Sequence, residues 1–386
     1  MSGTEPDPGH TANEASLSDV LRDCAPSFTP DLAGGDAWTA LDAACRRLPA
    51  TLSTFWGVET RLGDDRPELD VLVEIKRGAP GHALLAGSSA AIDRLCATAE
   101  TWRALRQFAM TWGDRAHALH GLVRNLWLEF DLVAARASAA DALAVPCVFW
   151  GPERAPITSG PALMDLLEAV GRAFAPYPRH LPRDLLDPLV RELPPGARAF
   201  QVGAMRLRGD VVLRVCINAI ASNAVPAWLG SAGWSGDLDA LREELRALDG
   251  LVRAIAVDVD VTAAGLGPKL GIECYLDWTN ASSDQWIPLL DFLGGARGLC
   301  RPAKRRAIAR FPQRTDFSIS EQLSVSRSGF LSPVLFRNIH HVKLAFVDDR
   351  FTEAKAYLGV ARPGVSIGQF LDPNAPAAME DGWYAP

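Results

Sequence analysis

Pairs of short stretches in which apolar and polar residues alternate strictly recur along this chain, and they constrain its fold most strongly. In the clearest stretch, residues 126–132, the even-numbered residues are apolar and the odd-numbered ones are Trp127, Glu129 and Asp131. Successive side chains of a β-strand point to opposite faces. Each such stretch therefore predicts a strand with one apolar face and one polar face.

The strands are predicted to come in five pairs separated by helices. The expected strands are 54–62 with 68–76, 124–132 with 146–150, 198–208 with 211–220, 252–262 with 268–278, and a strand within 317–337 with 339–347. The expected helices are 36–48, 88–118, 158–175, 182–193, 236–249, 284–294, 301–311 and 351–358. Helices that cover the apolar faces leave the polar faces to line a common interior. The fold class we expect is α+β, a ten-stranded antiparallel β-barrel of five ααββ-type repeats ringed by helices. An open sheet with a solvated polar face is the alternative.

Length, charge and cysteine content limit the class of protein. At 386 residues the chain fits one barrel domain, which we expect at 17–360, with a flexible tail at 1–16 and an irregular tail or lid at 361–386. The net charge of −7 argues against a nucleic-acid partner, and no apolar run is long enough for a membrane span. The acidic, polar N-terminus does not resemble a signal peptide, and seven widely spaced cysteines suit a reduced, cytoplasmic protein.

The polar faces of the strands carry cations from four of the five pairs. Converging cations of this kind suit a polyanion such as a diphosphate, and ion pairing with neighbouring carboxylates is the alternative. The candidate diphosphate-binding residues are Arg61, Lys76, Arg214, Lys269 and Lys343.

The same faces carry carboxylates and aromatic rings. A carboxylate in an aromatic lumen gains affinity for protons and can act as a base, unless a salt bridge holds it. Aromatic faces stabilise a carbocation, although ordinary packing explains them too. The candidate bases are Glu59, Glu74, Glu129 and Glu273, and the candidate aromatic wall is Trp127 and Tyr275, with Phe55, Phe149 and Met205 as further members.

Motifs of several common enzyme classes are missing from the sequence. We find no GxGxxG after a strand, no P-loop, no HExxH and no GxSxG. Asp258 and Asp260 share a face, but two carboxylates at this spacing are a weak cation signal. No metal site is predicted.

The order of elements and several short motifs resemble the aromatic prenyltransferases of the ABBA, or PT-barrel, family. The motifs are Trp56-Gly57-Val58-Glu59, residues 213–217 around Arg214, residues 269–275, and Val342-Lys343-Leu344. The resemblance covers about residues 36–358. It implies that Arg214, Lys269 and Lys343 bind a prenyl diphosphate and that Glu59 or Glu74 orients an aromatic acceptor. It also implies that no cofactor is obligatory, although Mg²⁺ can accompany the diphosphate.

Two functions follow as expectations. The first is transfer of a prenyl group from an allylic diphosphate to an aromatic or heteroatom acceptor, either a small molecule of secondary metabolism or a peptide side chain. The second is a non-catalytic barrel that binds a cationic or peptide ligand as an accessory protein of a biosynthetic pathway. The excess of carboxylates over cations on the polar faces favours the second.

Overall fold

The computed structural model describes residues 15–361 except 54, 65–67, 88, 133–142, 144, 154–156, 178–182, 208–209, 277–282 and 317–333. The expected tail at 1–16 and the expected tail or lid at 361–386 lie almost entirely outside the described residues. Most of the segment expected to hold the first strand of the fifth pair also lies outside them.

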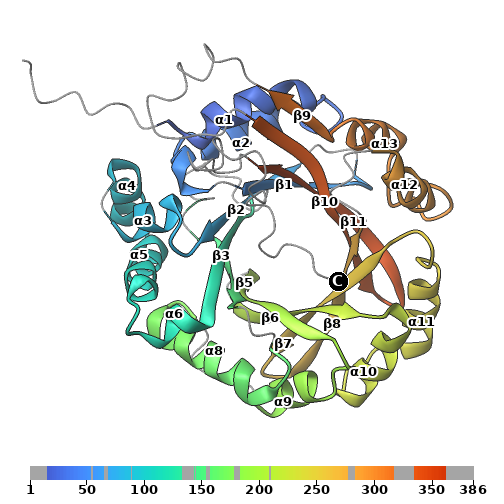
Figure 1. The fold of residues 1–386 in the computed structure, drawn as a ribbon. Coiled ribbons are helices and arrows are strands. Elements are labelled where there is room, and N and C mark those ends of the chain that lie inside the picture. Colours follow the sequence, from blue (N-terminus) through green and yellow to red (C-terminus); the bar gives the residue numbers. More distant parts are fainter. Residues whose placement is uncertain are drawn as a thin grey trace, which may run out of the picture.

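The described strands form one antiparallel sheet that closes on itself, so the predicted ten-stranded barrel is confirmed (Figure 1). Strand β11 pairs with both β1 and β10, and β9 extends the sheet beyond β10. The strands are β1 (Phe55–Arg61), β2 (Leu69–Lys76), β3 (Val123–Phe130), β4 (Cys147–Pro152), β5 (Arg198–Leu207), β6 (Asp210–Ile220), β7 (Ala254–Thr262), β8 (Gly265–Tyr275), β9 (Gln313–Asp316), β10 (Val334–Val347) and β11 (Arg350–Ala361).

A ring of helices surrounds the barrel, as the repeats predict (Figure 1). Helices α1 (Leu17–Cys24) and α2 (Gly35–Cys45) precede β1. The others, which connect successive strand pairs, are α3 (Pro80–Ala86), α4 (Ala90–Thr98), α5 (Glu100–Gly113), α6 (Ala118–Leu122), α8 (Gly160–Ala173), α9 (Arg183–Arg191), α10 (Val225–Ser231), α11 (Leu238–Arg246), α12 (Ile287–Gly294) and α13 (Pro302–Ala309).

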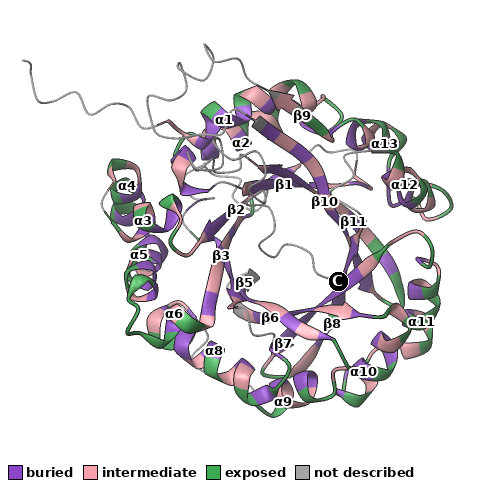
Figure 2. Ribbon diagram, viewed as in Figure 1, coloured by how far each residue is buried: buried purple, intermediate pink, exposed green. Residues whose placement is uncertain are grey.

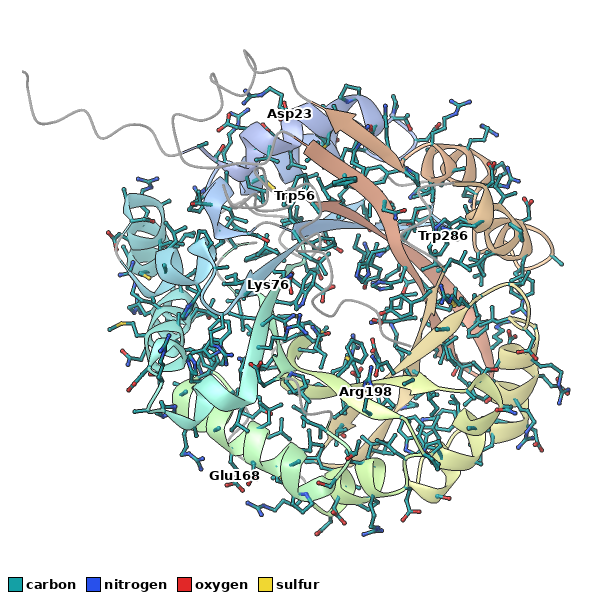
Figure 3. All side chains as sticks on the ribbon, viewed as in Figure 1. Asp23, Trp56, Lys76, Glu168, Arg198 and Trp286 are labelled. Carbon is teal, nitrogen blue, oxygen red and sulfur yellow. The ribbon has the colours of Figure 1, made fainter. Side chains whose placement is uncertain are left out.

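The hydrophobic core lies between the barrel and this ring. Val71, Val215, Val257 and Ile272, all on the predicted apolar faces, are fully buried there. Figure 2 shows strands at the centre that are buried or intermediate along most of their length, and exposed residues that gather on the outer sides of the helices. Because the apolar faces are covered in this way, the polar side chains of the same strands point into the lumen (Figure 3).

Three sequence-based expectations about elements were wrong. Residues 351–358 were expected to form a helix, but they belong to strand β11. The strand expected at 339–347 is part of β10, which is the first strand of the fifth pair and not the second. The helix expected at 88–118 is divided into three, because Ala99 is extended between α4 and α5 and residues 114–117 separate α5 from α6.

Strand β10 offers a test of the core. Leu344 is fully buried on its outer face, and Leu344→Ala is expected to lower the free energy of unfolding by about 2–5 kcal/mol, through lost burial and the cavity left behind. Met110→Ala is the control, because Met110 is 53% exposed on α5. Urea unfolding followed by circular dichroism measures both. Equal effects of the two substitutions would contradict the packing described here.

Candidate active site

The two ends of the barrel differ. Four strand pairs, β1–β2, β5–β6, β7–β8 and β10–β11, turn at one end, which we call the hairpin end. The helical connections join successive pairs at the other end, which we call the helix end. Antiparallel pairing therefore fixes the end at which each inward-facing side chain lies.

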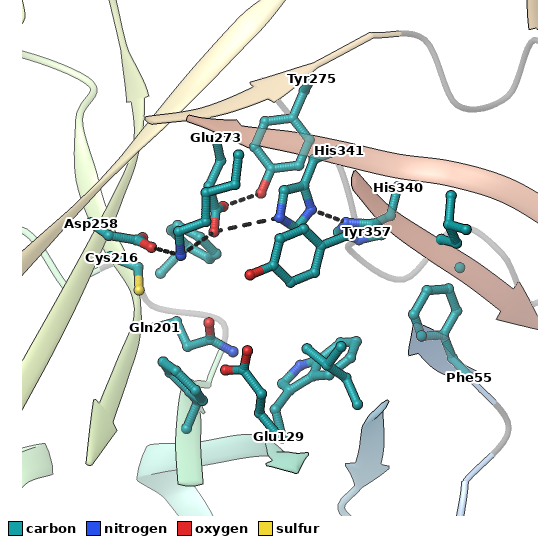
Figure 4. Close-up of a pocket in the computed structure, with 18 residues that line it drawn as sticks. Phe55, Glu129, Gln201, Cys216, Asp258, Glu273, Tyr275, His340, His341 and Tyr357 are labelled. Atoms are coloured by element: carbon teal, nitrogen blue, oxygen red, sulfur yellow. Dashed lines mark hydrogen bonds and ion pairs between the residues drawn. The ribbon is translucent and has the colours of Figure 1, made fainter. Parts of the chain in front are cut away.

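A cavity lies in the lumen, from its middle toward the helix end (Figure 4). It encloses about 690 Å³ of space free of protein atoms, solvent at its mouth included. All ten strands of the closed barrel contribute residues to its wall. Strand β9 is not part of the closed barrel and contributes none. The lining residues are Phe55, Gly57, Leu72, Trp127, Glu129, Phe149, Phe200, Gln201, Cys216, Asp258, Glu273, Tyr275, His340, His341, Lys343, Tyr357, Leu358 and Gly359.

Aromatic rings form a large part of the wall. The Tyr357 ring stacks on His341, with centroids 4.1 Å apart, and Phe55 meets Trp127 edge to face at 5.6 Å. Phe149 lies over the opposite strand at Gly203, where a β-carbon would come within 2.2 Å of the ring. Glycine at this position therefore lets the Phe149 ring lie against the barrel wall.

The hairpin end of the lumen contains five cations, each ion-paired with one or more carboxylates. We call this set the charged layer, and it includes four of the five predicted diphosphate ligands and one further lysine, Lys355. Its cations are Arg61, Arg214, Lys269, Lys343 and Lys355, and its carboxylates are Glu59, Glu68, Asp70, Asp258, Asp260, Glu273 and Glu353.

The pairs of the charged layer have specific geometry. Arg214 donates to both oxygens of Asp260, at 2.7 and 3.0 Å, which is the bidentate arrangement that guanidinium favours. Lys343 donates to Asp258 and lies 3.6 Å from Glu273. Despite burial, these carboxylates keep the pKa of Arg214 and of Lys343 above the ordinary value, so both groups remain charged.

Glu59 is held by two neighbours from β11. The Lys355 ammonium lies 2.7 Å from the Glu59 carboxylate, and the Tyr357 hydroxyl donates a hydrogen bond to it. Burial acts to raise the pKa of Glu59, but these contacts outweigh it and lower that pKa to about 2. Glu59 is therefore an ionised anchor for Lys355 and Tyr357, and it does not line the cavity.

Glu129 is different, because it has no hydrogen bond or ion pair within the described part of the chain. Its carboxylate points into the cavity beside Gln201 (Figure 4). Burial, reinforced by the nearby charge of Glu59, raises the pKa of Glu129 to about 7, although Lys343, Lys355 and Arg214 act in the opposite direction. A carboxylate with this pKa exchanges a proton readily at neutral pH.

Glu273 belongs to a hydrogen-bonded group on the opposite wall. The Tyr275 hydroxyl donates to Glu273 at 2.5 Å, and His341 Nε2 lies 3.7 Å from the same carboxylate (Figure 4). The two imidazoles of His340 and His341 share a hydrogen bond of 2.6 Å between their Nδ1 atoms. Burial lowers the pKa of His341 to about 3 and that of His340 well below its usual value, so both rings are neutral.

The structure brings most of the predicted site residues together. Trp127, Glu129, Glu273, Tyr275 and Lys343 line the cavity. Glu59, Arg61, Arg214 and Lys269 lie in the charged layer at the hairpin end.

Lys76 and Glu74 lie apart from these groups. Arg61 ends β1 and Lys76 ends β2, and since the two strands are antiparallel, the two cations lie at opposite ends of the barrel. The Glu74 carboxylate is buried, accepts a hydrogen bond of 2.7 Å from Asn125 and lies 3.7 Å from the Lys76 ammonium. The expectation that all five predicted cations converge was therefore wrong for Lys76.

Two residues of the site, Lys355 and Tyr357, were missed in the sequence because residues 351–358 were read as helical. The signal was present: Ala354, Ala356 and Leu358 alternate with Glu353, Lys355 and Tyr357, as on the other strands. Ala, Glu and Lys all favour helices, and their presence in this stretch obscured the two-residue period.

Metal-binding and membrane-spanning features can be checked for the described residues. Among them, no three His, Cys, Asp or Glu side chains are grouped so that they could hold a metal ion. None of the helices in the same part of the chain has the length and apolar character needed to cross a membrane. None of the seven cysteines, all of them among the described residues, forms a disulfide, and all but Cys147 are buried.

A closed barrel of ten antiparallel strands, ringed by helices in five repeats, has the PT-barrel architecture. Neither a scan of protein families nor a search of curated proteins finds a match to this chain. Among solved structures, the chain is similar to the prenyltransferase PriB, determined as a ternary complex with L-tryptophan and dimethylallyl thiolodiphosphate. The two share 14% sequence identity, over 90% of this chain and 96% of the other, with a TM-score of 0.48. The fold assignment rests on the strand pairing within this chain.

The Glu59–Lys355 pair gives a test of the charged layer. Lys355→Met leaves a buried carboxylate without its ammonium partner and is expected to lower the free energy of unfolding by about 3 kcal/mol at neutral pH. Because Lys355 lowers the pKa of Glu59, the difference from wild type should shrink as the pH falls toward about 2 and Glu59 becomes protonated.

Urea unfolding across this pH range measures the effect. The matched control is the double variant Glu59→Gln with Lys355→Met, which removes both charges and should recover most of the lost stability. A double variant no more stable than the single one would show that the two side chains do not stabilise each other.

Proposed function

We propose that this protein transfers a prenyl group from an allylic diphosphate to an aromatic or heteroatom acceptor inside its barrel. One observation carries the proposal: an aromatic cavity holds a carboxylate, Glu129, that has no partner among the described residues, and Lys343 joins this cavity to the five cations of the charged layer. The reaction needs these three kinds of group close together, namely cations for the leaving diphosphate, aromatic faces for the allylic cation, and a base for the acceptor proton.

The diphosphate would bind at the charged layer. Lys343 is the best placed of its cations, since it belongs both to this layer and to the cavity wall. Its ammonium is bound to Asp258, so phosphate oxygens must compete with a carboxylate for it. Arg214 lies next to it, held by Asp260 and 4.0 Å from Asp258.

The chemical step proceeds by breaking the bond between the allylic carbon and the diphosphate oxygen. The electron pair of that bond leaves with the diphosphate, whose charge the cations stabilise. The faces of Trp127, Phe149 and Tyr357 would stabilise the allylic cation by cation–π attraction while the acceptor attacks it. The acceptor then gives up one proton to Glu129, which balances the charge of the new bond.

Glu129 has the properties of the base in this scheme. It has no partner in the described residues to hold its charge, whereas Glu59 is fixed by Lys355 and Glu273 accepts a hydrogen bond from Tyr275. Its pKa of about 7 lets it take a proton and release it again near neutral pH. This assignment differs from the family resemblance, which pointed to Glu59 or Glu74.

The proposal requires no metal of its own, although Mg²⁺ can accompany the diphosphate as part of the substrate. The second function expected from the sequence, binding of a cationic ligand without turnover, is favoured by the excess of carboxylates in the lumen. The two functions give different results in one assay, because only the first converts dimethylallyl diphosphate to a prenylated product and free diphosphate.

The role of Glu129 is tested with dimethylallyl diphosphate and a panel of aromatic and amine acceptors, using mass spectrometry to detect products. The wild-type rate should rise with pH through about 7, since burial raises the pKa of Glu129 to that value and only the ionised carboxylate can take a proton. Glu129→Gln should lower the rate by at least about a hundredfold and abolish this pH dependence.

Glu168→Gln is the control, because Glu168 lies on α8 in the outer ring (Figure 3). Absence of any diphosphate-dependent product from wild type, with all acceptors tested, would count against prenyl transfer. A fully active Glu129→Gln variant would instead remove Glu129 from the mechanism.

Competition between Asp258 and phosphate for Lys343 gives a further prediction. Asp258→Asn should tighten the binding of inorganic pyrophosphate by about tenfold, since it removes one of the two carboxylates that hold the Lys343 ammonium, and Lys343→Met should weaken it by a similar factor. Isothermal titration calorimetry measures both. If the two variants bind pyrophosphate as wild type does, the diphosphate does not bind at Lys343.

A further inference from the structure

The charged groups that line the cavity are mostly negative. They are three carboxylates, Glu129, Asp258 and Glu273, and one ammonium, Lys343. The neighbouring imidazoles of His340 and His341 are neutral and contribute no positive charge. The cavity wall therefore carries a net negative charge, even with Glu129 protonated.

The wall also has carboxylate oxygens that accept no hydrogen bond from the described residues. Both carboxylate oxygens of Glu129 lack a hydrogen-bond partner within the described part of the chain. Asp258 Oδ1 is buried and lacks one too, although Oδ2 of the same carboxylate accepts from Lys343. The Lys343 ammonium is thus already engaged by the protein, while acceptor atoms of two carboxylates remain for a ligand.

Aromatic faces surround these acceptors. Trp127 and Phe149 are register partners on the neighbouring strands β3 and β4, beside Glu129 of β3. The stacked Tyr357 and His341 lie across the cavity from Glu129 (Figure 4). Aromatic rings with carboxylates among them attract cations by two additive effects, the ring quadrupole and the full negative charge.

We propose that the acceptor taken by this cavity is an organic cation with several N–H donors, an ammonium or guanidinium group on an apolar stem. Its N–H groups would donate to Glu129 and Asp258, and its stem would lie against Phe149 and Trp127. In the transfer reaction one of these protons would pass to Glu129 before the attack, because a protonated nitrogen has no free lone pair to form the new bond. The neutral nitrogen then attacks the allylic carbon, and the prenylated product leaves as the cation. The inference rests on the proposed function only in naming this ligand the acceptor; the preference for a cation holds whether or not the ligand is prenylated.

A neutral phenol or indole fits these groups less well. It offers a single O–H or N–H donor, so it leaves most of the acceptor atoms of Glu129 and Asp258 unsatisfied and the negative charge uncompensated. An anionic acceptor would in addition be repelled by all three carboxylates. A small amine and the side chain of a lysine or arginine in a peptide share the required chemistry.

The test compares probes that differ in charge and have similar size. Binding of 2-phenylethylamine, 2-phenylethanol and 3-phenylpropanoate to the full-length protein is measured by isothermal titration calorimetry at low salt, with N-acetylarginine amide as a peptide-like cation. We expect at least one of the two cations to bind ten times or more tightly than the alcohol, and the carboxylate to bind weakest. Tighter binding of the arginine amide indicates a peptide source, and tighter binding of the amine indicates a small molecule.

Glu129→Gln separates charge from shape, because it keeps the size of the side chain. It should weaken binding of the preferred cation about tenfold and leave binding of 2-phenylethanol unchanged, which also shows that the cavity is intact. The control Glu168→Gln should change neither. Binding of both cations no tighter than the alcohol, or an unchanged cation affinity in Glu129→Gln, would overturn the proposal.

The binding experiment tests the preference for cations separately from the assay of prenyl transfer, because each can succeed when the other fails. Tight, Glu129-dependent binding of cations with no prenylated product would support the inference and contradict prenyl transfer. Efficient prenylation of a neutral phenol or indole, with no preference for cations in binding, would support prenyl transfer and contradict the inference.

Discussion

The pairing of strand β11 with both β1 and β10 is the constraint on which the rest of the structure depends. It closes the sheet, so the polar faces of the strands line a common interior. Charged groups in such a space are stable only with partners, because burial of an unpaired charge is very costly. The charged layer at the hairpin end satisfies this requirement, with each of its five cations bound to a carboxylate.

Glu129 is the exception to this rule, and the exception defines the site. Its carboxylate is enclosed by aromatic rings and has no partner in the described residues, and its raised pKa is the result. A group of this kind costs stability when it is ionised, which is common at functional positions. The contrast with Glu59, whose pKa is lowered by Lys355, shows that neighbouring groups and not residue type decide the role of each carboxylate.

The fold was largely predictable from the sequence because the two-residue period of strands is a local signal. The barrel and its apolar outer faces followed from that period. The site was less predictable, since the partners of each charge depend on strand register and on which end of the barrel a residue occupies. Lys76 and Arg61 belong to one strand pair but lie at opposite ends, and Lys355 was concealed by the helix-favouring residues around it.

The glycine under the Phe149 ring has a consequence for the range of molecules that the barrel can enclose. Gly203 contributes no side-chain atoms to the lumen, yet a single methyl group there would collide with the ring. The breadth of the chamber is thus set by a position that bears no charge and takes part in no hydrogen bond through a side chain. A replacement at such a position would change the dimensions of the ligand that fits while every ionic contact stays in place.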